Sequence, residues 1–177
     1  MIPKYGSGPD PRDFIVCHGY GCAYRTAIAL DPAEWQGARA EFYPPLPDAA
    51  AERRQVAGAI VILERAVGQR TGTAAHQRRE TLNAGDGTQL DCVDEAVNTW
   101  TYLTMLERDG LLRHHAVGEI LHRSTGLGFA PHNTATLIAR DSGERFAVDP
   151  DLVDAPLPPP IVPVAAWLGP WPPRLSW

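Results

Sequence analysis

The sequence predicts an α+β fold in which helices precede an antiparallel sheet. Helical periodicity and capping residues dominate residues 31–108, whereas residues 132–149 are β-rich and interrupted by one turn. The chain has 177 residues, of which 44% are hydrophobic and 21% charged, and this is enough for a buried core. We therefore expect a single domain over residues 1–177, in which a central helix packs on the sheet.

The first thirty residues are expected to be largely extended. Residues 1–12 contain several glycines and prolines, which is typical of an arm. Phe14-Ile15-Val16 is a short apolar run and predicts a strand. The segment from Ala23 to Leu30 has a mixed pattern and is also expected to be extended.

Two helices follow. Asp31-Pro32-Ala33-Glu34 is typical of a helix start, because Asp31 can cap, Pro32 suits the first helical position and Glu34 completes a capping box. This helix is expected to run to about Phe42, where a proline cluster ends it. Asp48 then caps a helix from about Ala49 to Val67. Its apolar stripe consists of Val56, Ile60, Leu63 and Val67.

A central helix is predicted from about Cys92 to Arg108, after a long glycine-rich loop over residues 68–90. Asp91 is the N-cap candidate, and Gly110 is expected to stop the helix. The apolar face consists of Val93, Ala96, Val97, Trp100 and Leu103.

The sheet is expected to come from the next segments. Residues 111–124 alternate loosely and predict one strand. His132–Arg140 and Glu144–Asp149 flank an Asp-Ser-Gly turn and predict a β-hairpin. If this turn centres on Ser142, Asp149 lies opposite Ala135, near the end of the hairpin that His132 opens.

Residues 150–177 form a distinct C-terminal tail. They contain nine of the 17 prolines and three of the five tryptophans. The prolines predict extended polyproline structure. The interleaved Trp and Leu residues favour a tail that packs back on the domain, and a partner-binding strip is the alternative.

Cys92 is the candidate nucleophile. The first turn of a helix directs unpaired backbone N–H groups and the positive end of the helix dipole at the residue there. A thiol in that position loses its proton more easily, and the thiolate is the reactive form. Asp94 and Glu95 lie in the same turn, and their charges oppose a thiolate while stabilising the helix start. A buried, inert Cys92 is the alternative.

Thiol catalysis also needs a base and a group that orients the base. His132 and Asp149 are expected near one end of the hairpin, where a carboxylate can hold the imidazole in the correct tautomer. Gln89, three residues before Cys92, can donate a side-chain N–H to an oxyanion. The sequence therefore predicts a triad of Cys92, His132 and Asp149, assisted by Gln89.

These residues carry a resemblance to a known family. Asp91-Cys92 at a helix start, His132 entering a hairpin and Val148-Asp149-Pro150 leaving it resemble the transglutaminase-like superfamily of papain-like thiol enzymes. The bacterial transglutaminase-like cysteine peptidases look closest, over roughly residues 85–152. The resemblance implies a papain-like fold and a peptidase or amidase acting on a peptide or protein. Its roles would be Cys92 as nucleophile, His132 as base and Asp149 as the orienting group.

The resemblance also has implications for metal binding and for the alternative function. Some bacterial members bind calcium through acids that flank the cysteine, which makes Asp91 and Asp94 calcium candidates besides their capping role; no other cofactor is expected. Val93 stands where the family often has an aromatic residue, and Asn133-Thr134 replaces its usual small-aromatic pair. A catalytically degenerate relative that acts as a binding or scaffold protein is therefore the alternative.

Cys17 and Cys22 bracket a short loop that has three interpretations. A disulfide fits an exported protein, and two buried thiols fit a reduced one. A metal site would need further ligands, and a redox or metal protein built on this pair is the third functional hypothesis. The histidines available as ligands are His76, His114, His115 and His122.

Composition excludes several other functions. The net charge is −5, with both signs mixed, and no basic block is typical of nucleic-acid or membrane-surface binding. No run approaches the ~18 apolar residues of a membrane span. Residues 1–8 lack the apolar core of a signal peptide, so a cytoplasmic location and, after removal of a signal, a periplasmic one both stay open.

Overall fold

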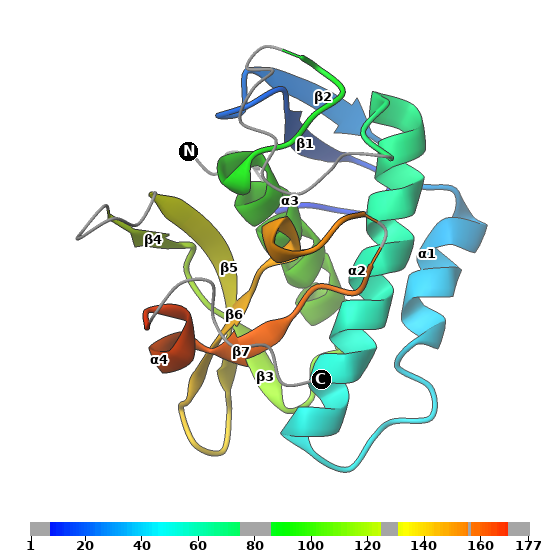
Figure 1. Ribbon diagram of the computed structural model, residues 1–177. Helices are drawn as coiled ribbons and strands as arrows, with labels where there is room; N and C mark the ends of the chain where they lie inside the picture. Colours follow the sequence, from blue (N-terminus) through cyan, green and yellow to red (C-terminus); the bar gives the residue numbers. More distant parts are fainter. Residues whose placement is uncertain (1–7, 75–85, 125–130, 156, 170–177) are drawn as a thin grey trace.

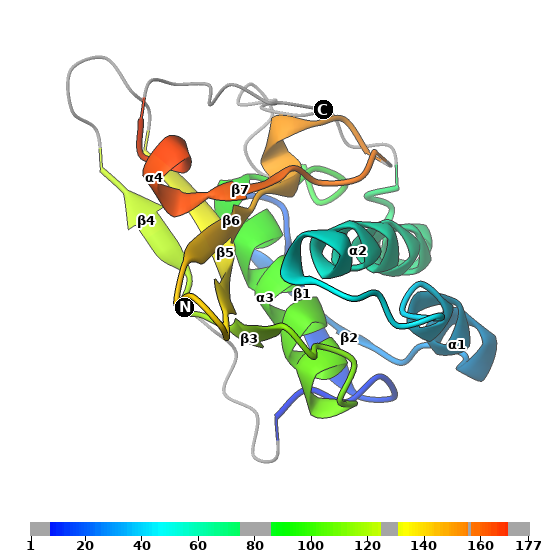
Figure 2. The same ribbon diagram turned by 90° about the horizontal axis from the view of Figure 1, so that it is seen from below.

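The computed structural model describes residues 8–74, 86–124, 131–155 and 157–169. The fold is α+β, as predicted, and all of its strand pairs are antiparallel. Helix α3 (Cys92–Arg108) lies at the centre, between a five-stranded sheet and helix α2 (Figures 1 and 2). Cys92 and the end of the sheet that carries His132 thus belong to two elements that pack on each other.

Helices α1 (Pro32–Ala40) and α2 (Ala49–Thr71) begin where their capping residues predict. The Asp31 backbone N–H donates to Glu34 Oε2 at 2.8 Å, and the Ala51 N–H donates to Asp48 Oδ1 at 2.7 Å. Helix α2 continues past the predicted end at Val67, because the left-handed residue that terminates it is Gly72, with φ of 82°. The predicted apolar stripe of α2 is buried in the core.

The main sheet has the order β3-β5-β6-β7, with β4 also paired to β5. Its strands are β3 (His115–Val117), β4 (Leu121–Arg123), β5 (His132–Ala139), β6 (Arg145–Val148) and β7 (Ile161–Pro163). A second sheet of two strands, β1 (Phe14–His18) and β2 (Tyr24–Ile28), packs against α3 through β1. Within the residues described above, no helix is long and apolar enough to cross a lipid bilayer.

The single strand predicted over residues 111–124 is wrong in detail, because the segment forms two short strands. Val117 pairs with Leu137 and Leu121 pairs with Thr134. The β3–β4 segment therefore advances by four residues where β5 advances by three. This extra residue is a bulge. Gly118 permits it, since a Cβ there would collide with Thr136 Oγ1. The bulge lets β4 reach the end of β5 that carries His132.

The predicted hairpin is confirmed, with its register shifted by one residue. Ala135 pairs with Val148 and not with Asp149. The connection is a four-residue loop closed by hydrogen bonds between Ala139 and Glu144 and between Gly143 and Ala139. Gly143 adopts the left-handed conformation that this loop requires. The shift moves Asp149 one position closer to His132 than the sequence predicted.

The C-terminal tail packs back on the domain as far as it is described. A 3-10 turn (η1, Pro150–Leu152) leaves the hairpin, β7 pairs with β6, and a short helix α4 (Val164–Trp167) follows. The tail is therefore less extended than its proline content predicted. Trp167 is completely buried, whereas the other two tail tryptophans, Trp171 and Trp177, lie outside the described residues.

Candidate functional site

Cys92 is the first residue of α3 and is partly exposed. The predicted cap is confirmed, since Asp91 Oδ1 accepts hydrogen bonds from the backbone N–H groups of Val93 at 3.1 Å and Asp94 at 3.0 Å. The Asp94 carboxylate in turn accepts from the Asp91 N–H at 3.2 Å, which completes a capping box. The thiol therefore stands at a well-defined helix start, where the helix dipole favours a negative charge.

His132 and Asp149 are in contact. The His132 Nε2 atom lies 2.8 Å from Asp149 Oδ2, and both side chains are buried, at 5% and 1% exposure. Strand pairing explains this contact, because His132 opens β5 and Asp149 follows the last residue of β6. The predicted proximity of the two residues is thus found in the structure.

His132 also reaches the thiol. Burial on its own would lower the pKa of His132, but hydrogen bonds to Asp149 and Cys92 and the charges of Asp149 and Asp151 raise it to about 9. Nε2 faces Asp149, and Asp151 Oδ2 lies 3.5 Å from Nδ1. A histidine in this environment is an imidazolium at neutral pH, and it can balance the charge of a thiolate beside it.

Two further residues complete the surroundings of the imidazole, and the sequence analysis identified neither. The Trp167 indole N–H donates to Asp149 Oδ2 at 2.7 Å, and its ring lies 5.8 Å from the His132 ring. Asp151, in η1, supplies the second carboxylate. The tryptophan content of the tail was the available signal for Trp167. For Asp151 the only signal was its place two residues after Asp149.

Asn133 faces the sulfur from the strand side. Its side-chain N–H donates to Cys92 Sγ at 3.5 Å, and its Oδ1 lies 3.1 Å from the His122 Nδ1 atom. The Asn133 amide thus lies between His122 and Cys92, with its N–H group toward the sulfur. The sequence analysis treated Asn133 only as a departure from a family pattern, whereas the structure makes it a neighbour of the thiol.

Gln89, the predicted oxyanion donor, is held in the loop before α3 by its backbone. The Gly19 N–H donates to the Gln89 carbonyl oxygen at 2.9 Å, and the Gln89 N–H donates to the Asp86 carbonyl oxygen at 3.1 Å. The Gln89 Oε1 atom is buried without a hydrogen-bond partner among the described residues. The side-chain amide that lies on the sulfur is that of Asn133.

The two calcium candidates bind backbone amides. Asp94 accepts hydrogen bonds from the N–H groups of Tyr20 and Cys22, and Asp91 accepts one from Gly21. The described residues contain no group of three or more His, Cys, Asp and Glu side chains that could hold a metal ion. Both carboxylates thus serve to join the first turn of α3 to the loop that follows β1.

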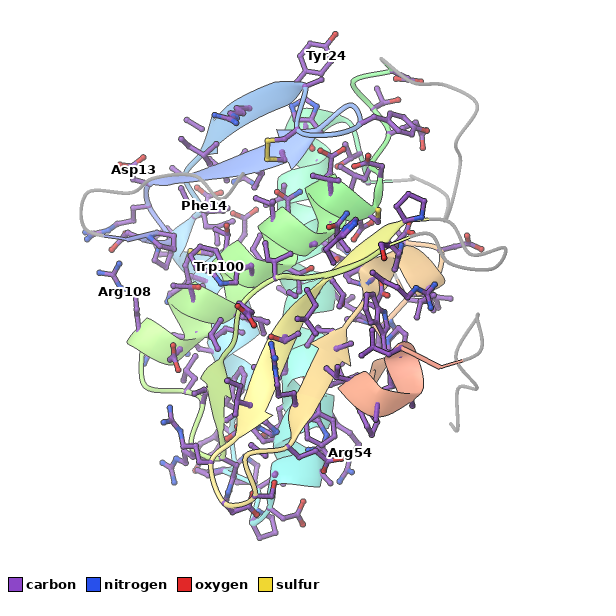
Figure 3. The ribbon with its side chains drawn as sticks, turned by 90° about the vertical axis from the view of Figure 1, so that its left-hand side faces the viewer. Asp13, Phe14, Tyr24, Arg54, Trp100 and Arg108 are labelled. Atoms are coloured by element: carbon purple, nitrogen blue, oxygen red, sulfur yellow. A yellow bond between two sulfur atoms is a disulfide. The ribbon has the colours of Figure 1, made fainter. Side chains whose placement is uncertain are left out.

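Cys17 and Cys22 form a disulfide, which is the first of the three interpretations of this pair. Figure 3 shows it as a yellow bond beside β1. Oxidised sulfurs are not available as thiolate ligands, so the pair does not form a metal site in this state. Cys92 is left as the free cysteine of the chain.

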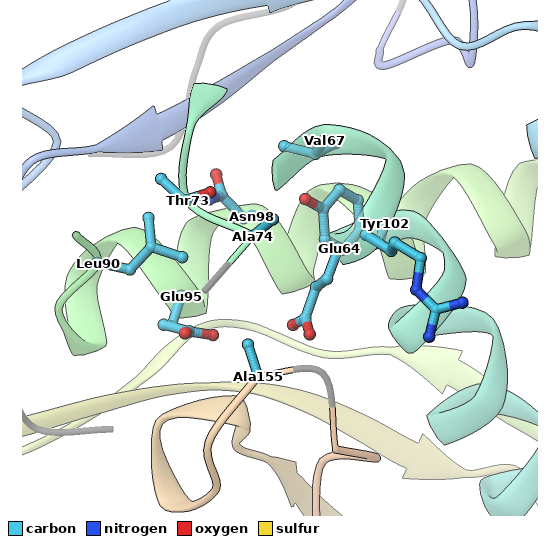
Figure 4. Close-up of a pocket in the computed structure, with 10 residues that line it drawn as sticks. Glu64, Val67, Thr73, Ala74, Leu90, Glu95, Asn98, Tyr102 and Ala155 are labelled. Atoms are coloured by element: carbon cyan, nitrogen blue, oxygen red, sulfur yellow. The ribbon is translucent and has the colours of Figure 1, made fainter. Parts of the chain in front are cut away.

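Two cavities lie along α3. One of about 80 Å³ lies between α2, α3 and the segment after η1, with Glu64, Glu95 and Tyr102 in its lining (Figure 4). Another of about 610 Å³ lies beside Trp35 and Met105, and its distance from Cys92 along the helix is about 20 Å. Among the described residues, neither lining includes Cys92.

Comparison with known proteins adds no relative: no family model, curated protein or solved structure matches this chain. The site is therefore defined by its geometry. A cysteine at a helix N-terminus contacts a buried histidine, and a buried carboxylate holds the far side of that histidine. This arrangement belongs to the class of thiol–imidazole–carboxylate sites.

Proposed function

We propose that the protein is a thiol acyl-transfer enzyme, a peptidase or amidase of the transglutaminase-like, papain-like type. The observation that carries the proposal is the chain of contacts from Cys92 to His132 to Asp149. Such contacts between nucleophile, base and orienting group are what nucleophilic catalysis requires. The order of the three residues, and the placing of the cysteine on a helix beside an antiparallel hairpin, support the family resemblance.

In the proposed reaction the Cys92 thiolate attacks the carbonyl carbon of a peptide or side-chain amide. The C–N bond breaks as the tetrahedral intermediate collapses, and the leaving amine takes the proton from His132 Nδ1. An acyl-enzyme remains on the sulfur. His132, now neutral, takes a proton from water or from an acceptor amine as it attacks the thioester. The C–S bond then breaks, the carboxylic acid or new amide is released, and the Cys92 thiolate and the His132 imidazolium are restored. Asp149 holds the imidazole through Nε2 during both steps.

The oxyanion of the intermediate needs donors near the sulfur. The Asn133 side-chain N–H supports this role, because it lies 3.5 Å from Cys92 Sγ. The Val93 and Asp94 amides at the start of α3 donate to Asp91 instead. Gln89 stays a second candidate donor, from the loop before the helix. A peptide or protein is the proposed substrate, since the thiol is partly exposed.

Acylation by an activated ester tests the function. We expect p-nitrophenyl acetate to release a stoichiometric burst of p-nitrophenol, with one acetyl group found on the Cys92 peptide by mass spectrometry. Cys92→Ala should abolish the burst, and His132→Ala should slow it by about 10² to 10⁴-fold because the acid–base group that stabilises the thiolate is lost. His114→Ala, a histidine remote from the sulfur, is the matched control and should keep the burst. A burst that survives Cys92→Ala would refute the proposal.

A non-catalytic binding protein is the second candidate. The observation in its favour is that neither cavity described along α3 includes Cys92. In that case Cys92 should react with iodoacetamide at pH 6 no faster than a free model thiol, although it is partly exposed. The proposed enzyme requires a clearly faster reaction at this pH, because the thiolate is the species that alkylates.

A further inference from the structure

The loop closed by the Cys17–Cys22 disulfide has an unusual backbone. Four consecutive residues adopt left-handed conformations, with φ of 79° at Gly19, 71° at Tyr20, 63° at Gly21 and 60° at Cys22. For Tyr20 and Cys22, which carry a Cβ atom, this conformation costs about 1–2 kcal/mol each. Successive N–H groups in such a turn converge on one side and form a concave site for an anion, called a nest.

The anion in this nest belongs to the chain itself. Asp94 accepts the N–H groups of Tyr20 at 2.8 Å and Cys22 at 2.7 Å, while Asp91 Oδ2 accepts the Gly21 N–H at 3.0 Å. Asp94 is completely buried. Three amides of a disulfide-closed loop thus offset the charges of two carboxylates in the first turn of α3.

Those two carboxylates are next to the thiol in the chain, since Asp91 precedes Cys92 and Asp94 follows two residues later. Negative charge at this distance opposes formation of a thiolate. Burial and the charge of Asp91 raise the pKa of Asp94 to about 6, while the amide hydrogen bonds act in the opposite direction. The amides thus favour the ionised form of Asp94, and their N–H dipoles screen its charge and that of Asp91 from the thiol.

Other contacts tie the same loop to the segment around Cys92. The Asn98 side chain bonds both the N–H and the carbonyl oxygen of Cys17, at 2.7 and 2.8 Å. The Gly19 N–H donates to Gln89, and His18 Nδ1 lies 2.6 Å from the Gly87 carbonyl oxygen. A change in the loop would therefore be transmitted to the start of α3.

We propose that the Cys17–Cys22 disulfide is a redox control of Cys92: it holds the nest of amides on Asp91 and Asp94, and its reduction lowers the reactivity of the thiol. This inference rests on the proposed function, because it concerns the nucleophile of that site. Without the disulfide, the strained conformations of Tyr20 and Cys22 relax, and the two carboxylates lose their amide donors. Their charges then act on Cys92 with less compensation.

Reduction of the Cys17–Cys22 disulfide proceeds by thiol–disulfide exchange with a dithiol reductant. One thiolate of the reductant attacks Cys22 Sγ, the more exposed sulfur, and the electron pair of the broken bond leaves with Cys17 Sγ, which takes up a proton. The second thiolate of the reductant then displaces Cys22 Sγ, which also takes up a proton. The products are two protein thiols and an oxidised, cyclic reductant.

The test is the rate at which iodoacetamide alkylates Cys92, followed on the Cys92 peptide by mass spectrometry between pH 5 and pH 9. Oxidised protein is compared with protein reduced by dithiothreitol and with the double variant Cys17→Ser/Cys22→Ser. We expect half-maximal alkylation to move up by about one pH unit in both reduced forms, which slows the reaction up to about tenfold at pH 7.5, above the pKa of Asp94. Equal profiles in the oxidised and reduced forms would overturn the proposal.

Asp94→Asn separates the charge effect from simple loosening of the fold. In the Cys17→Ser/Cys22→Ser background this variant should accelerate alkylation at pH 7.5, above the pKa of Asp94, and by a larger factor than in the oxidised protein. Equal acceleration in both backgrounds would show that the disulfide does not act through this carboxylate. The absolute rate in the oxidised protein, against a free model thiol, tests the proposed function separately from this difference between redox states.

Discussion

At the scale of single residues, His132 links the site to the stability of the fold. Its folded pKa of about 9 lies above the ordinary value of 6.5, with burial opposing the shift and Asp149, Cys92 and Asp151 causing it. The protonated form is therefore favoured in the folded state. This contribution to stability is fully present below pH 6.5 and is lost as the pH rises through 9.

We expect the free energy of unfolding of the wild type to fall between pH 6.5 and pH 9.5 by about 3 kcal/mol. In His132→Gln most of this dependence should disappear, because no group with the raised pKa is left. Urea unfolding at a series of pH values measures the pH dependence of stability in the wild type and in the variant. His114→Gln is the control that should keep the wild-type slope; identical slopes in wild type and His132→Gln would contradict the assignment.

Asn133 is the second residue whose role can be measured. Removal of an oxyanion donor costs about 10² to 10³-fold in rate, so Asn133→Ala should slow acylation of Cys92 by that order while the unfolding midpoint changes little. Asn133→Asp should be slower still, because a carboxylate would face the thiolate. The comparison with Gln89→Ala decides between the two candidate donors: if only Gln89→Ala slows acylation, the oxyanion donor is the one predicted from the sequence.

At the scale of elements, the start of α3 supports both the fold and the site. The Asp91 carboxylate accepts three backbone N–H groups, from Val93, Asp94 and Gly21, whereas the cap of α2, Asp48, accepts one from Ala51. The second oxygen of Asp91 thus stabilises a contact between elements besides the helix itself.

Replacement of the two caps by alanine should therefore give unequal losses of stability. We expect Asp48→Ala to lower the free energy of unfolding by about 1 kcal/mol and Asp91→Ala by about 2–3 kcal/mol, since two more amides lose their acceptor. Chemical denaturation of both variants under identical conditions measures the difference. Equal losses would mean that the contact of Asp91 with the loop at Gly21 contributes nothing measurable.

Local signals explain which elements could be predicted. The caps of α1, α2 and α3 and the hairpin are set by residues within a few positions of one another, so the sequence predicted them closely. The bulge at Gly118 was missed because it depends on the approach of Thr136, 18 positions away in the chain. The hairpin register was one residue off because loop length, and not turn composition, determines which residues face each other.

The candidate site follows the same division. The helix start predicted Cys92, and the hairpin predicted the proximity of His132 and Asp149. Asn133 and Trp167 could not be assigned from the sequence, since their roles come from pairing of β4 with β5 and from folding of the tail over β6. The nest could not be predicted either, because it joins residues more than 70 positions apart.

At the scale of the whole molecule, the tail is part of the site. Strand β7 adds to the edge of β6, the Asp149 N–H donates to the Pro160 carbonyl oxygen, and α4 places Trp167 over the His132 ring. The Arg123 guanidinium lies over the Trp167 ring, 5.3 Å from its centroid, and donates a hydrogen bond to the Trp167 carbonyl oxygen. Helix α4, the last described helix, thus contacts His132 and Arg123 through Trp167.

Trp167→Phe tests this coupling, because it keeps an aromatic ring over His132 and removes the 2.7 Å hydrogen bond to Asp149. We expect a loss of about 1–2 kcal/mol in stability, as for a buried bond to a charged group. Without the indole donor the Asp149 carboxylate interacts more strongly with the imidazolium, so the pKa of His132 should rise further. An NMR titration of the His132 ring measures this rise, and acylation of Cys92 should slow because the orienting carboxylate is less fixed. Trp100→Phe, at a partly buried position in the middle of α3, is the matched control and should lower stability without moving the His132 titration. If both variants leave the titration unchanged, the tail covers the site without altering the pKa of His132.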